Sequence, residues 1–168
     1  MNKRKKILLA LDSSDASMRA VNYIADVIGG NANYHVRLLH VLDPLPPKLR
    51  EFRGSENPQK EEGLEEELRQ RTEQWIAQSE HQWQPTLEKA RSMLKRAGVP
   101  ANAIETEFWE TVNHEDLVND ILQAGRKDGC STIVVGRESF SWLKEMFHHH
   151  VADELVRKAH GLTIWVVE

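Results

Sequence analysis

Polar and small residues stand where three apolar runs of this sequence end. Asp12 follows the run 7–11, Val41 and Asp43 lie at the end of the run 35–42, and Gly136 ends the run 132–135. In an open parallel sheet, ligands bind beyond the carboxyl ends of the strands, where the strand order reverses. We therefore expect Asp12, Val41 and Gly136 to converge on one cleft. Asp12 could contact a ligand there, or act as a turn or cap residue at a helix start.

Hydroxyl groups and imidazoles follow Gly136. Ser139 and Ser141 could bind a phosphate or be ordinary loop hydroxyls. The run His148-His149-His150 lacks the i, i+4 spacing that places two ligands on one helix face. We interpret it as a surface or interface segment. The alternatives are a substitute anion site at a helix N-terminus and a lone transition-metal site.

Composition excludes several classes of function. The formal net charge is -4, from 22 basic and 26 acidic residues, so there is no overall basic field for nucleic acid. The basic cluster 3–6 is interpreted as a solvated lead-in to the first strand. No stretch approaches the ~20 apolar residues of a membrane span. The single cysteine, Cys130, is predicted to be a structural thiol in a reducing compartment, and the cytoplasm is the expected location.

Three common active-site motifs of α/β proteins are missing from the sequence. Gly-x-Gly-x-x-Gly does not follow the first strand, and no Gly-x-x-x-x-Gly-Lys-Ser/Thr or Gly-x-Ser-x-Gly occurs. A dinucleotide fold, a P-loop ATPase and an α/β-hydrolase are therefore not expected. With no convincing nucleophile or acid–base pair, we expect no enzymatic activity and no catalytic residue.

Strand and helix patterns alternate along the chain. Apolar runs predict strands at 7–11, 35–42, 104–109, 132–135 and 162–167, and the segments between them carry apolar residues at helical spacing. The order βαβαβαβαβ predicts an α/β fold, with one five-stranded, mostly parallel sheet and helices on both faces. The strand 104–109 alternates with charges, which favours a sheet edge. We expect one domain over 1–168, with a variable loop and long helix at about 43–97.

The predicted helix at 62–97 is unusually long. It would extend about 54 Å, which exceeds what a compact domain of this size can cover. We expect a kink or break near Pro85, or an exposed arm. Trp75 and Trp83 lie on its apolar stripe, where core packing is the default role and a partner-binding face is the alternative.

These positions together resemble the universal stress protein family. The start, Lys6-Ile7-Leu8-Leu9-Ala10-Leu11-Asp12-Ser13-Ser14, is similar to the family's first strand and Asp-Gly-Ser turn, with Ser13 in place of glycine. His40-Val41 is similar to the end of its second strand. The segment 131–136, the helix around 151–156 and the strand 163–167 resemble its C-terminal half. The resemblance covers nearly the whole chain and is lowest at about 43–90.

The resemblance also implies a nucleotide site that this sequence has lost in part. ATP-binding members carry Gly-x-x-Gly, nine residues and Gly-Ser/Thr. Here Gly136 is kept, while Ser139, His149 and His150 replace the other motif residues. Bare backbone N–H groups hold phosphates, and a ring at His149 would crowd them. If any ATP or AMP binds weakly, the candidate residues are Asp12, Val41, Gly136, Ser139, His149, His150 and Val151. Otherwise no cofactor is expected.

The last strand is a candidate dimer interface. Nothing later in the sequence can cover the residues Thr163, Ile164, Trp165, Val166 and Val167, and an open strand edge invites pairing with a second copy. Dimers through this strand are also what the resemblance implies. The leading hypothesis is a non-enzymatic cytoplasmic dimer in stress response or signalling that docks unknown protein partners. The alternatives are an adenine-nucleotide sensor with a degraded phosphate loop and a nucleotide-activating enzyme of a related fold.

Overall fold

A computed structural model describes residues 5–50, 58–143 and 150–168 and contains one five-stranded sheet. Its strands are β1 (Lys5–Ala10), β2 (Tyr34–Leu42), β3 (Ile104–Glu110), β4 (Thr132–Gly136) and β5 (Thr163–Val167). The strand order is β3-β2-β1-β4-β5, and every neighbouring pair is parallel. The predicted α/β fold is therefore confirmed. β3 and β5 form the two edges, and for β3 the alternation with charges had favoured this position.

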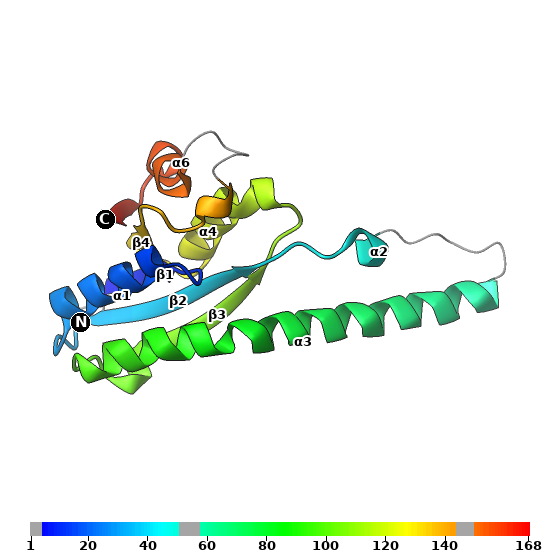
Figure 1. Cartoon of the computed structure of the whole chain (residues 1–168), viewed down its shortest axis with the longest axis horizontal. Helices are drawn as coiled ribbons and strands as arrows, with labels where there is room; N and C mark the ends of the chain where they lie inside the picture. Colours follow the sequence, from blue (N-terminus) through cyan, green and yellow to red (C-terminus); the bar gives the residue numbers. More distant parts are fainter. Residues whose placement is uncertain (1–4, 51–57, 144–149) are drawn as a thin grey trace.

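Helices connect the strands and cover both faces of the sheet (Figure 1). The α-helices are α1 (Asp15–Ile28), α2 (Pro47–Arg50), α3 (Pro58–Arg96), α4 (Leu117–Lys127) and α6 (Val151–Lys158). Short 3-10 turns are η1 (Ala101–Ala103), η2 (His114–Asp116) and η3 (Ser141–Leu143). Ser14 caps α1, since its side chain accepts a hydrogen bond from the Ser17 N–H.

Alternate residues of the central strands enter two separate cores. Ile7 and Leu9 of β1 pack with α1 and the C-terminal part of α3, which contributes Leu87, Ala90 and Leu94. Leu8 and Ala10 face the opposite side and pack with α4 and α6. Because both faces of β1 and β4 are covered beyond their first residues, the buried parts, 7–10 of β1 and 133–135 of β4, are continuously apolar.

The N-terminal part of α3 extends beyond the sheet as an arm (Figure 1). The helix has 39 residues, about 58 Å at 1.5 Å per residue, and continues through Pro85. The predicted break at Pro85 is therefore wrong, and the exposed arm is the correct alternative. Pro85 has no N–H to donate to the carbonyl of His81, and both residues are exposed.

The two tryptophans of α3 lie outside both cores. Trp75 and Trp83 are partly buried, whereas Leu87, one helical turn after Trp83, is fully buried. The expected core packing of the two tryptophans is therefore wrong. The stripe leaves the body of the sheet near Trp83, and both rings line cavities instead.

Candidate functional site

One cavity of the described chain opens at the carboxyl ends of β1 and β2. It has a volume of about 520 Å³. Five segments enclose it: the ends of β1 and β2, α3, the connection from β3 into α4, and the segment after β4. The lining residues are Asp12, Ser13, His40, Val41, Leu42, Asp43, Trp83, Thr111, His114, Leu117, Phe140 and Trp142. The cavity therefore lies where the topology predicts a ligand site.

Asp12 holds the turn between β1 and α1. Its Oδ1 accepts hydrogen bonds from the Ser14 N–H at 3.0 Å, from the Ser14 hydroxyl, and from the Ser17 hydroxyl at 2.6 Å. Its Oδ2 accepts one from the backbone N–H of Phe140 at 2.7 Å. The carboxylate thus satisfies four donors of the protein itself, which supports the turn-and-cap role of Asp12 over ligand binding.

Gly136, which was expected to share one cleft with Asp12 and Val41, is not among the lining residues of the cavity and instead packs closely against α1. A Cβ at Gly136 would lie 2.4 Å from the Ala16 carbonyl oxygen and 2.6 Å from the Ser139 hydroxyl. Such distances are far inside van der Waals contact. Only glycine allows β4 to end against the first turn of α1. Val41, the third predicted residue, is buried and lines the cavity.

Ser139 points into the protein. It is 1% exposed, and its hydroxyl lies 2.8 Å from the Ser17 hydroxyl, in the network of Asp12. Val151 is 1% exposed in the core beneath α4 and α6. His150 is the N-cap residue of α6. Ser141 is exposed on η3. His148 and His149 lie outside the described residues.

His40 is a buried polar residue of the cavity. In the sequence it served only as part of the resemblance at the end of the second strand, and no role was assigned to it. Its ring Nδ1 lies 2.7 Å from the carbonyl oxygen of Leu11, an acceptor, so Nδ1 carries the proton. Burial lowers the pKa of His40 despite opposing effects of the Leu11 hydrogen bond and of Asp43 and Asp12. His40 is therefore neutral near pH 7, with Nε2 as the ring's acceptor.

Aromatic rings from distant segments complete the cavity. Trp83 stacks on His40, with ring centroids 3.8 Å apart and an interplanar angle of 27°. Trp142 meets His114 edge to face at 4.8 Å. The sequence signal for Trp83 was its place on the apolar stripe of the long helix, but nothing in the sequence indicated that His114 and Trp142 would meet.

Phe140 has an unusual backbone at the cavity wall. Its φ is 60°, in the left-handed region that residues other than Gly, Asn and Asp rarely adopt. Its side chain is 2% exposed and its N–H is held by Asp12. The hydrogen bond and the burial together stabilise this conformation.

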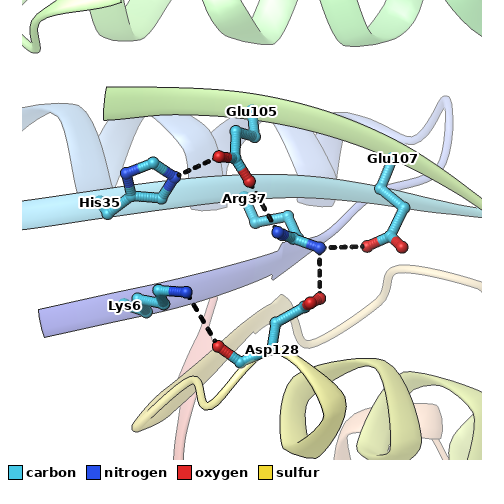
Figure 2. A network of polar contacts seen from close by, with 6 residues as sticks. All are labelled: Lys6, His35, Arg37, Glu105, Glu107 and Asp128. Carbon is cyan, nitrogen blue, oxygen red and sulfur yellow. Dashed lines mark hydrogen bonds and ion pairs between the residues drawn. The ribbon is translucent and has the colours of Figure 1, made fainter. Parts of the chain in front are cut away.

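A second polar cluster lies on the sheet face that α4 partly covers (Figure 2). Arg37 of β2 pairs with Glu105 at 2.6 Å, with Glu107 at 2.9 Å and with Asp128. Burial opposes its charge, but these carboxylates together hold the pKa of Arg37 above its usual value. The parallel register places Arg37 opposite Glu105. One cation thus holds three carboxylates that come from β3 and from the end of α4, so we interpret the cluster as structural.

Other chemical features of the described residues are few. No group of three or more His, Cys, Asp and Glu side chains in 5–50, 58–143 and 150–168 is arranged to hold a metal ion. Cys130 is buried, and burial raises the pKa of its thiol, as a structural cysteine requires. None of the helices in these ranges is long and apolar enough to cross a membrane.

Comparisons with known proteins agree on one family. Residues 3–167 match the model of the universal stress protein family. A universal stress protein in complex with cAMP has a TM-score of 0.64 and 14% identity, with 99% of this chain and 98% of that one covered. A family member from Burkholderia pseudomallei has a TM-score of 0.57 and 22% identity, with 98% and 96% covered.

A further structural relative comes from Archaeoglobus fulgidus. It is a universal stress protein in complex with dAMP, with a TM-score of 0.57, 16% identity and full coverage of both chains. At such identities the likeness concerns the fold. No curated protein matches the sequence.

Proposed function

Since the chain belongs to the universal stress protein family, we propose that it is a non-enzymatic stress-response protein that acts as a cytoplasmic homodimer and binds nucleotides weakly or not at all. The observation that carries the proposal is the inward orientation of Ser139. At the position where ATP-binding members have their second glycine, this chain has a buried side chain bonded to Ser17. The cytoplasmic location rests on the single, buried cysteine.

The N-terminus of α6, which would face a bound phosphate, is also unfavourable to phosphate binding. α6 has Asp153 and Glu154 in its first turn, where they already complement the positive end of the helix dipole. A phosphate near this end would meet two carboxylates. Val151, the first residue of α6, is buried in the core and offers no hydroxyl.

The exposed edge of β5 supports the dimer. β5 contains no charged residue, whereas β3 at the opposite edge carries Glu105, Glu107 and Glu110. Charges protect an edge strand from pairing with other chains, and an uncharged apolar edge favours it. The helices beside β5 also expose apolar side chains: Tyr23 and Val27 on α1 and Val156 on α6.

The second candidate function is an adenine-nucleotide sensor. The cavity has room for a small ligand and includes Asp12 and Val41, two residues predicted for this role. Two structural relatives are in complex with cAMP and dAMP. Against this reading, the Asp12 carboxylate is already occupied by four donors of the chain.

Calorimetry with Mg-ATP, AMP and cAMP separates the two functions. We expect no binding, or dissociation constants well above the micromolar range. A low-micromolar constant for any of the three would contradict the proposal and favour the sensor. The double change His149→Gly with His150→Ser restores two motif residues and should strengthen ATP binding, with circular dichroism as a control that the variant is folded.

A further inference from the structure

The side chains that line the cavity at the ends of β1 and β2 differ in kind from those of a phosphate-binding site. Trp83 and Trp142 bring two indole rings from segments far apart in the sequence, and the ring of His114 adds further aromatic surface. The face of an indole ring carries negative electrostatic potential and attracts cations. Among the described lining residues there is no Arg or Lys, which a nucleotide phosphate would favour.

Hydrogen bonds fix the proton positions of two polar groups of the cavity, His40 and Thr111, and what each can still offer a ligand is an acceptor. The Nδ1–H of His40 is used by the Leu11 carbonyl, which leaves Nε2 with a lone pair. Thr111 donates its hydroxyl proton to the Asn113 carbonyl at 2.8 Å, so its remaining capacity is also as an acceptor. Asp43, an exposed carboxylate at the rim, adds a negative charge. A matching ligand supplies N–H donors and a positive charge.

We propose that this cavity binds a small planar cation with N–H donors, such as an amidinium, a guanidinium or an aromatic ammonium group. The plane of the cation lies against the indole rings, and its N–H groups face His40, Thr111 and Asp43. The inference rests on the proposed function in one respect, namely that the cavity is not a nucleotide site. It names instead the class of ligand that the cavity selects.

Three probes of nearly equal shape test the charge. Benzamidine is a planar cation, benzamide its neutral counterpart and benzoate its anion. We expect benzamidine to quench tryptophan fluorescence saturably and to bind roughly tenfold more tightly than benzamide. Benzoate should not bind. Equal affinity for benzamidine and benzamide, or binding of benzoate, would overturn the inference.

Two variants locate the binding. Trp142 is 54% exposed, so Trp142→Ala can be made without disturbing a core, and it should weaken benzamidine binding about fivefold or more. Asp43→Asn should weaken benzamidine but leave benzamide unchanged. The matched control is Asp26→Asn, an exposed aspartate near the far end of α1, which should change neither. Unchanged benzamidine affinity in both Trp142→Ala and Asp43→Asn would refute the site.

The two proposals fail separately. A chain that binds neither Mg-ATP nor benzamidine retains the proposed function and loses this inference. A chain that binds Mg-ATP at low micromolar concentration loses the proposed function, whatever its affinity for benzamidine.

Discussion

The carboxylate of Asp12 accepts a hydrogen bond of 2.7 Å from the backbone N–H of Phe140, which lies 128 residues later in the chain. This bond joins the end of β1 to the segment that follows β4. The same carboxylate caps the turn into α1 through Ser14 and Ser17. One side chain therefore fixes two walls of the cavity, including the strained backbone of Phe140.

Asp12→Asn should destabilise the protein by about 2 kcal/mol, because an amide has one acceptor oxygen and its NH₂ group would face donors. Urea unfolding followed by circular dichroism measures the change. The control is Asp15→Asn, an exposed residue in the first turn of α1, which should cost about 0.5 kcal/mol. Equal effects of the two changes would contradict the role given to Asp12.

Gly136→Ala should be severely destabilising, by about 3 kcal/mol, because the new Cβ would overlap backbone atoms of Ala16 that cannot rotate away. Gly63→Ala is the opposite case. Gly63 is an exposed glycine of α3 with nothing near its missing Cβ, so alanine should stabilise the helix by up to about 1 kcal/mol. Thermal unfolding of the two variants should therefore shift in opposite directions.

Arg37→Met should lower stability by about 2 kcal/mol, because three carboxylates lose their shared cation. Adding Asp128→Asn should recover part of that loss, with a coupling energy of about 1 kcal/mol in a double-mutant cycle. Arg19→Met, which breaks a 3.8 Å exposed pair with Glu138, should have almost no effect. Strict additivity of Arg37→Met and Asp128→Asn would show that the network is not coupled.

Asp120 of α4 should destabilise the protein when it is charged. Burial raises the pKa of its carboxyl, neighbouring Thr111 and Trp109 offset this only in part, and Asp116 raises it further. Its Oδ2 has no hydrogen-bond partner among the described residues. Because the folded-state pKa exceeds the unfolded one, the cost is full above the folded-state value and disappears as pH falls below the ordinary range of aspartate.

Asp120→Asn should therefore stabilise the protein at pH 7 by up to about 1 kcal/mol and have little effect at acidic pH. Urea unfolding across this pH range measures the difference, with the exposed Asp26→Asn as the control. A gain that is constant with pH would exclude ionisation of Asp120 as its cause.

The proposed dimer is best tested on the helices beside β5 rather than on the strand. Ile164 and Val166 pack against the core under α6, so charged residues there would unfold the chain. Val27 and Val156 are 47% and 56% exposed, and their joint change to Asp should convert a dimer to a folded monomer. Light scattering gives the mass. Val112→Asp, 68% exposed in the loop after β3, should remain dimeric. A monomeric wild type would refute the interface.

Strand positions and the parallel character of the sheet were predictable because they depend on local patterns and on general topology. The apolar runs at 7–11 and 132–135 require burial on both faces, and alternation with helices requires parallel crossovers. The charges along 104–109 likewise indicated an edge strand. These features depend on which residues are apolar and in what order, and both are visible in the sequence.

Which side chains line the cavity, and in which direction they point, could not be predicted from the sequence because both depend on tertiary contacts. Apolar periodicity assigned Trp83 to a core, but the sheet is shorter than α3, so the stripe leaves the body at Trp83 and the ring stacks on His40 instead. The motif spacing placed Ser139 where a phosphate would bind. The close approach of Gly136 to Ala16 brings Ser139 against Ser17, and its hydroxyl turns inward. Sequence spacing shows which residues are near one another along the chain, whereas the direction of a side chain depends on the element packed against it.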